Sequence, residues 1–206
     1  MTMRWMIALL MVAAVAVAPA VGFAQSTTDK AAAGKDTVKN GDKARMASGD
    51  RKFVMDALKG GMAEVELGKL ASEKASNDQV KEFGKRMVDD HGKAGEELKT
   101  LAQNKGLTPP TEIDGKHKRL HERLSKMSGA EFDRAYVSEM VKDHRKDVKE
   151  FQREAEKAKD ADVKAFASKT LPTLQEHLKQ IEDIDKQMKQ TAKTDRGAAS
   201  PKTEKK

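Results

Sequence analysis

Three histidines and one glutamate occupy positions from which they could bind one metal ion together. Glu64, His91 and His144 each lie on the apolar face of a long helical pattern, and His177 lies in the last such pattern. A histidine on a core-facing stripe must be hydrogen-bonded, metal-bound or neutral, because burying an unpaired imidazolium is costly. Imidazole and carboxylate are suitable ligands for zinc, copper, iron or manganese. The residue types therefore predict one transition-metal site formed by these four side chains.

The composition of the 206-residue chain excludes several other kinds of chemistry. There is no cysteine, which excludes disulfides, iron–sulfur clusters, thiolate zinc sites and cysteine nucleophiles. We find no nucleotide-binding loop and no nucleophile motif. The 40 basic and 33 acidic residues leave a formal net charge of +7, a mild excess that suits solubility better than nucleic-acid binding. We therefore expect no nucleic-acid partner.

The N-terminus, residues 1–24, has the pattern of a secretory signal peptide. Arg4 precedes an apolar run at residues 5–17, and small residues precede a predicted cleavage site after Ala24. The run is shorter than the roughly 20 residues of an ordinary membrane span, although an uncleaved anchor is the alternative. The protein is therefore expected to be periplasmic or otherwise exported.

Two further segments contain too few large apolar residues to fold alone. Residues 25–49 are rich in Ala, Gly, Lys, Ser and Thr and are predicted to be a flexible linker. Residues 190–206 end in a lysine-rich stretch and are predicted to be a disordered basic tail. Such a tail could touch an anionic envelope surface weakly, although a solvated tail is the commoner explanation. The folded part is expected to be one domain, residues 50–189.

Apolar residues recur every three or four positions through this domain, which predicts helices rather than strands. The predicted helices cover about residues 50–75, 77–105, 112–127, 128–159 and 161–189. Asn77 is a good N-terminal cap, and residues 128–131 match a capping box. Pro172 removes a backbone donor and is expected to kink the last helix.

The order of these helices predicts an all-α, ferritin-like four-helix bundle. Gly60, Gly61 and Gly68 lie on the first helix, where small residues would let a neighbouring helix approach closely. Two hairpins with tight turns, near Ser76 and Lys159, are joined by a long crossover that carries the short extra helix. A simple up-down bundle with an added helix is the topological alternative.

The four candidate ligands fall at similar heights in such a bundle. Glu64 and His91 lie on either side of the first turn, at heights that differ by about 4 Å. His144 and His177 differ by about the same amount around the second turn. His177 lies about 60° from the centre of its apolar stripe and is predicted to be a flank position. We therefore expect one carboxylate and three imidazoles to converge at mid-bundle.

Acidic residues and methionines adjoin these histidines in the sequence. Asp90, Asp143 and Glu176 each directly precede one histidine, about 100° round the helix. They are predicted to be solvated, or to contact a ligand from outside the site. Met87 and Met140 lie one turn before two of the histidines, where a thioether would favour copper. Methionine on a helical stripe is nevertheless more often core packing.

Four motifs in the folded part resemble the domain of unknown function 4142 family, and the resemblance covers about residues 51–186. The motifs are Ala63–Ala71, Met87–His91, Gly129–Tyr136 and Thr170–His177. The resemblance implies an exported bacterial protein with a ferritin-like bundle, often labelled an outer-membrane protein, and implies no established activity. The residues that the family pattern includes are Glu64, His91, Asp133, His144 and His177. Asp133 lies near a helix start and is predicted to cap or bond across helix ends.

Three functional hypotheses follow. The first is an exported protein that binds or stores one transition-metal ion in an envelope or stress role. The second is a structural or envelope-associated protein whose histidines form a hydrogen-bonded polar core with Glu64. The third, a di-iron oxidoreductase, is disfavoured because such proteins carry Glu-x-x-His pairs. Here the residues three before the histidines are Val88, Val141 and Leu174, so catalysis is not expected.

Overall fold

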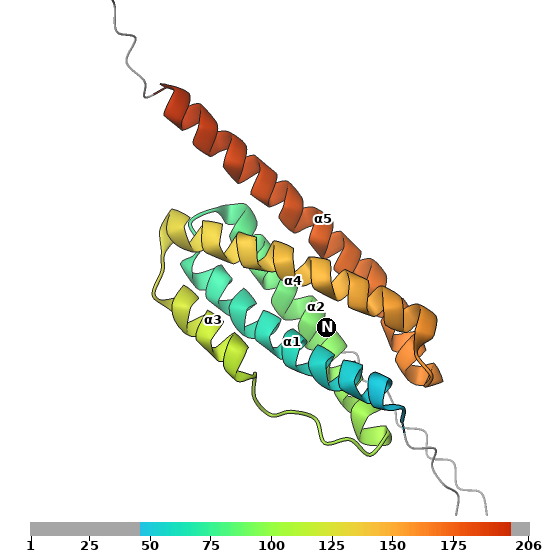
Figure 1. Ribbon diagram of the computed structural model, residues 1–206. Helices are drawn as coiled ribbons and strands as arrows, with labels where there is room; N and C mark the ends of the chain where they lie inside the picture. Colours follow the sequence, from blue (N-terminus) through green and yellow to red (C-terminus); the bar gives the residue numbers. More distant parts are fainter. Residues whose placement is uncertain (1–45, 199–206) are drawn as a thin grey trace, which may run out of the picture. The chain divides into compact units, whose positions relative to one another are not determined.

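Residues 46–198 are described by the computed structural model, and this part of the chain contains five helices and no strand (Figure 1). The helices are α1 Ser48–Lys74, α2 Asp78–Asn104, α3 Gly115–Ser125, α4 Gly129–Lys157 and α5 Ala161–Ala198. α1 pairs with α2 and α4 pairs with α5, while the short α3 in the crossover packs against α1 and α4. The predicted all-α, ferritin-like four-helix bundle is therefore confirmed.

Buried carboxylates tie each hairpin turn to the other hairpin. Asp133 of α4 accepts hydrogen bonds from the backbone N–H groups of Ser76 and Asn77, both at 3.0 Å. Asp50 of α1 accepts from the backbone N–H of Lys159 at 2.9 Å and from that of Asp160 at 2.7 Å. The predicted role of Asp133 across helix ends is confirmed. These bonds fix the register of the two hairpins, and with it the height of every side chain in the core.

α1 and α2 touch through glycine backbone. A Cβ built on Gly68 would lie 2.6 Å from the carbonyl oxygen of Gly84, and a Cβ on Gly84 would lie 2.7 Å from that of Gly68. The close approach expected at Gly68 is therefore present. It is absent at Gly60, where a Cβ would meet nothing within 4 Å, and Gly61 has only the His91 ring near that limit. These two glycines line a cavity instead.

Two apolar clusters fill the bundle, one toward each end. One cluster includes Phe83, Met87, Tyr136 and Met140, which are fully buried. The other is formed by residues from all the helices except α3, with the addition of Leu107 from the crossover. Met87 and Met140 therefore contribute to core packing, as methionine on a helical stripe usually does. The buried polar residues of the next section are not part of either cluster.

Helix ends differ from the prediction in three places. α3 is shorter than residues 112–127, and Ser128 precedes α4 without the side-chain hydrogen bond of a capping box. α5 continues through Pro172 and past the predicted end at residue 189 to Ala198, so the prediction of a disordered tail is wrong for residues 190–198, which are helical. The predicted signal peptide, most of the linker and residues 199–206 lie outside the described residues. No helix within residues 46–198 is long and apolar enough to span a membrane.

Candidate metal centre

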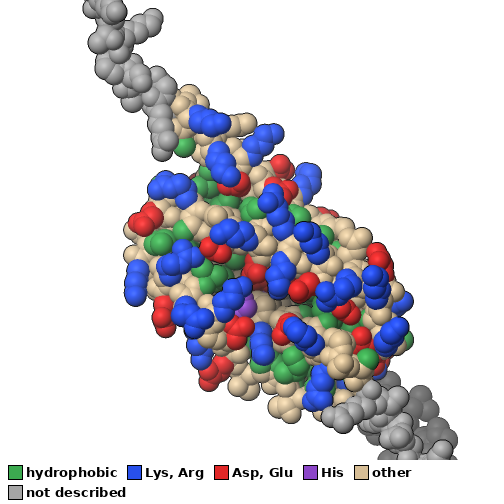
Figure 2. Space-filling model, in the orientation of Figure 1, with side chains coloured by type: hydrophobic (Ala, Val, Ile, Leu, Met, Phe, Trp, Pro, Cys, Tyr) green, Lys and Arg blue, Asp and Glu red, His purple; other side chains and the backbone are tan. Residues whose placement is uncertain are grey.

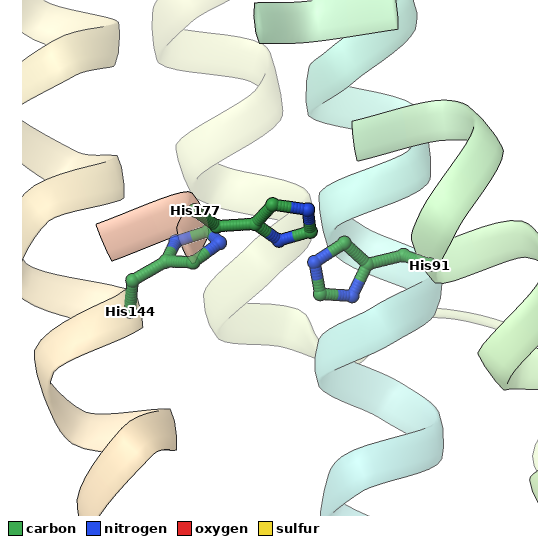
Figure 3. A group of neighbouring side chains, drawn as sticks. All are labelled: His91, His144 and His177. Atoms are coloured by element: carbon green, nitrogen blue, oxygen red, sulfur yellow. The ribbon is translucent and has the colours of Figure 1, made fainter. Parts of the chain in front are cut away.

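Three histidines from three different helices meet inside the bundle. His91 of α2, His144 of α4 and His177 of α5 each offer a ring nitrogen, and these nitrogens lie within 4.8 Å of one another. Figure 3 shows the three rings turned toward a common space. Glu64 of α1 lies against two of these rings, with Oε2 2.9 Å from Nδ1 of His91 and Oε1 3.6 Å from Nδ1 of His144. All four helices of the bundle thus contribute to one polar layer.

The layer is shielded from water. His144 and His177 are 0% exposed, Glu64 is 2% exposed and His91 is 8% exposed. Phe83 covers one side, with its ring centroid 5.9 Å from that of His144 and 6.2 Å from that of His177. In such surroundings an unpaired charge is costly and a bound ion is poorly screened.

His177 is more central than its sequence position suggests. The prediction placed it on the flank of an apolar stripe that included Leu178 and Met188, but these two residues are only partly buried. Ile184, about 20° from His177 round the helix, is instead fully packed, which shifts the centre of the buried face of α5 toward His177. The flank prediction is therefore wrong, and the ring is one of the most buried in the chain.

Each histidine is held by one ring nitrogen. Nδ1 of His91 donates to Glu64, and Nδ1 of His144 donates to the backbone carbonyl of Met140 at 3.0 Å. Nε2 of His177 donates to Oδ2 of Asp90 at 2.8 Å. A carbonyl oxygen can only accept, so the hydrogen of His144 must be on Nδ1. Each bond therefore fixes the orientation of a ring and the nitrogen that carries its proton.

The opposite nitrogen of each ring has no partner. Nε2 of His91, Nε2 of His144 and Nδ1 of His177 are buried and make no hydrogen bond. Buried polar atoms without partners are uncommon and call for an explanation. Metal-ligating histidines characteristically donate the far N–H to a carboxylate or a backbone carbonyl while the near nitrogen faces the ion. The three rings show this pattern, with two carboxylates and one carbonyl behind them.

Electrostatics divide the three rings into two kinds. Burial lowers the pKa of His144, and burial lowers that of His177 to about 4, so both rings are neutral at pH 7. Burial alone would lower the pKa of His91 too, but the charge of Glu64 outweighs it and raises that pKa. Burial alone would raise the pKa of Glu64, but this is outweighed, chiefly by the positive charge of His91, and the pKa falls to about 2. Of the three rings, His91 is therefore the one whose protonated form the site favours.

The sequence did not reveal which partners the charged residues behind the histidines would have. Asp90 was predicted to be solvated or to contact a ligand from outside the site, and it does contact a histidine of the site, but this is His177 on another helix rather than its neighbour His91. Arg86, one turn earlier, donates to Asp90 at 3.1 Å and to Glu176 at 2.8 Å, which fixes the Asp90 carboxylate from behind. The spacing of Arg86 and Asp90 is a recognisable signal for an ion pair on one helix. Nothing in the sequence indicates that this pair faces His177.

The buried neutral state of His177 predicts a pH-dependent stability for the metal-free protein. Its ring takes up a proton near pH 6.5 in the unfolded chain but only near pH 4 in the fold. The unfolded state therefore binds more protons between these values, so this contribution to stability is complete above pH 6.5 and is lost as pH falls to about 4. The loss should be on the order of 3 kcal/mol, measured by urea denaturation with a chelator present.

The matched comparison is His177→Gln, which lacks this titration. The stability difference between the wild type and the variant should shrink between pH 6.5 and pH 4. Asp147, whose pKa burial raises well above its usual range, titrates in the opposite sense but is present in both proteins. Parallel stability curves for the two proteins over this interval would contradict the assignment.

Comparisons with known proteins agree on the fold. The family model described as Domain of unknown function (DUF4142) matches residues 35–184. A DUF305 fragment from Deinococcus radiodurans is similar with a TM-score of 0.61 and 15% identity, over 69% of this chain and 98% of that one. A DUF305 protein from Streptomyces coelicolor has a TM-score of 0.59 and 12% identity, over 68% and 92% of the two chains.

A third similar structure is CopM in its Cu(II)-bound form. Its TM-score is 0.57 and its identity 16%, over 67% of this chain and 96% of that one. No curated protein matches the sequence. At these identities the solved structures show a shared helical fold.

Proposed function

The chain belongs to the DUF4142 family, whose description assigns no activity, and we propose that it is an exported protein that binds one transition-metal ion through His91, His144 and His177. One observation carries the proposal: three buried histidines each offer a ring nitrogen within 4.8 Å of the others, and each has one buried nitrogen without a hydrogen-bond partner. Export is supported by the signal-peptide pattern of residues 1–24. The role that fits is capture or storage of an ion in the envelope.

Glu64 belongs to the proposed site as the group that supports His91 and balances charge. Its Oε2 accepts the hydrogen bond from Nδ1 of His91, which is the nitrogen that faces away from the other rings. A divalent ion among three neutral imidazoles would bring two positive charges into a dry layer. The carboxylates of Glu64 and Asp90 lie directly behind two of the rings and offset that charge.

The donor set favours zinc or copper among the four metals considered. Three imidazoles with room for one further ligand suit either ion, whereas manganese prefers carboxylate and water oxygen. The fold is shared with a protein solved in a Cu(II)-bound form, which makes copper the natural first ion to test beside zinc. The methionines one turn away pack in the core, so a thioether contribution is not part of the proposal.

The test is a metal titration of the purified protein after removal of metal with a chelator. We expect one Zn²⁺ or Cu²⁺ per chain, a raised melting temperature on binding, and weaker retention of Mn²⁺. No stoichiometric ion and no stabilisation by any of these metals would contradict the proposal.

A non-catalytic structural role is the second candidate, favoured by the ion pair between Glu64 and His91. On that hypothesis the layer serves only to fix the helices, and filling it with hydrocarbon should be neutral or stabilising. The variant His144→Leu separates the two, because it would keep the fold in either case but lose the metal only if the first is right.

Asp90→Asn and Glu64→Gln are predicted to weaken metal affinity without removing a ligand. Both amides are close in size to the carboxylates, but they lack the negative charge that offsets the ion and makes the ring nitrogen a better donor. Loss of such a partner typically costs about 10- to 100-fold in metal affinity. Glu176→Gln, which alters an exposed partner of Arg86, is the control and should change affinity little. Equal affinities for all three variants and the wild type would contradict this role.

A further inference from the structure

A cavity of about 280 Å³ connects the surface of the bundle with the histidine layer. Its walls come chiefly from α1 and α4, with α3 at one side, and Glu64 and His91 are among the residues that line it. Gly60 and Gly61 form part of the α1 wall, and the absence of side chains there leaves the space open. The outer surface carries basic and acidic side chains interspersed, without a single-sign patch on the face shown in Figure 2.

Carboxylates line this cavity at successive depths. The side chain of Glu150 is 33% exposed, that of Asp147 is 17% exposed and that of Glu64 is 2% exposed. Asp143 lies on the same face of α4, one turn from Asp147. A cation moving inward would therefore meet carboxyl oxygens at each depth before it reaches His91.

Carboxylates outnumber lysines in this cavity, because six carboxylates and four lysines line it. Within the described residues Asp143 makes no ion pair, and Lys146 is shared between Asp147 at 3.8 Å and Glu150 at 3.4 Å. Oε1 of Glu64, a buried residue in the lining of the cavity, has no hydrogen-bond partner and lies 3.6 Å from Nδ1 of His144. A buried carboxylate oxygen without a hydrogen bond is costly, and it leaves an acceptor available to a cation in the cavity. This orphaned oxygen is a separate observation from the acidic lining.

Two other openings reach the histidines, but their carboxylates are paired. Between α2 and α5, Glu97 binds Lys169 at 2.7 Å, and Asp90 is engaged by Arg86 and His177. Beside the crossover, the acidic residues Glu66, Glu96 and Glu112 each contact a lysine. Carboxylates outnumber lysines by one at most in these two openings, against an excess of two in the cavity between α1, α3 and α4.

We propose that the cavity between α1, α3 and α4 is the access route by which a divalent cation reaches the histidines. The inference rests on the proposed metal-binding function. The carboxylates serve to attract and pass the ion rather than to hold it, because within residues 46–198 only the three histidines bring ligand atoms close enough to share an ion. Negative charge in a cleft accelerates the association of cations through its field.

The first arm of the test removes charge. Stopped-flow mixing with Co²⁺ follows the visible absorption that appears when the ion enters an imidazole site. The double variant Asp143→Asn, Glu150→Gln should associate about tenfold more slowly than the wild type at low ionic strength, and about 1 M salt should remove the difference. The final spectrum should be unchanged. Glu96→Gln with Glu97→Gln, in the other two openings, should associate at the wild-type rate.

The second arm blocks the space. Gly60→Leu fills the proposed route and Gly92→Leu fills the opening beside the crossover, and in both a new Cβ meets nothing within 4 Å. Gly60→Leu should slow association by about tenfold or more, since a filled passage must open before an ion can pass. Gly92→Leu should not.

The outcomes separate the two proposals. Equal rates for the cavity variants and the wild type, each with the full Co²⁺ spectrum, would overturn the route while leaving the metal site in place. Slower association in the control variants than in the cavity variants would also overturn it. If the wild type never develops the bound Co²⁺ spectrum, the metal site itself fails and the route fails with it.

Discussion

Replacement of His144 by alanine is expected to reduce the affinity for Zn²⁺ or Cu²⁺ by about a thousandfold, because it removes a ligand rather than a supporting residue. His144 is 0% exposed and its ring is held by the carbonyl of Met140, so no other side chain on α4 can replace it. Isothermal titration with each metal measures the change. His144→Phe tests the same loss while filling the space that alanine leaves empty.

The matched control removes histidines that are not part of the layer. The chain has five histidines, and the two outside the site, His117 and His121, lie on α3. The double variant His117→Ala, His121→Ala should keep one metal ion per chain with affinity near that of the wild type. If that control loses the metal and His144→Ala retains it, the ligand assignment is wrong.

Gly84→Ala is expected to destabilise the fold by about 2 to 3 kcal/mol, even though alanine is the better helix former. A Cβ at this position would lie 2.7 Å from the carbonyl oxygen of Gly68 and 2.8 Å from the Cβ of Ala71. Both neighbours belong to the body of α1 and cannot move without separating the two helices. Urea denaturation at constant pH gives the free energy of unfolding for each protein.

Gly92→Ala is the control on the same helix. A Cβ at Gly92 would meet nothing within 4 Å, so the substitution should be neutral or stabilise the protein by up to about 1 kcal/mol. If Gly84→Ala lowers the free energy of unfolding and Gly92→Ala raises it, backbone contact between α1 and α2, rather than helix propensity, decides the effect. A loss below about 1 kcal/mol for Gly84→Ala would mean that the helices can separate easily.

The fold could be predicted from the sequence because its signals are local. Apolar periodicity defines the long helices, and the turns near Ser76 and Lys159 are too short for anything but antiparallel neighbours. Heights along the bundle follow from counting residues away from these turns. The count alone predicts that Glu64, His91, His144 and His177 lie at one height in the bundle, and it requires no information on contacts between helices.

The rotation of each helix about its axis could not be obtained in the same way. It is set by packing between helices, so the flank position expected for His177 was wrong and the pairing of Asp90 with His177 was not foreseen. The same holds for glycines. Gly60, Gly61 and Gly68 look alike in sequence, yet only Gly68 faces the backbone of another helix. Which glycine packs and which lines a cavity depends on the partner helix.

X-ray absorption spectroscopy of the protein loaded with one equivalent of Zn²⁺ tests the central claim most directly. The account predicts a coordination sphere dominated by three imidazole nitrogens at about 2.0 to 2.1 Å, with the multiple-scattering pattern of histidine rings. His144→Phe should lose one of these imidazoles. A sphere of oxygen ligands without imidazole scattering would contradict the account, since it would place the ion away from His91, His144 and His177.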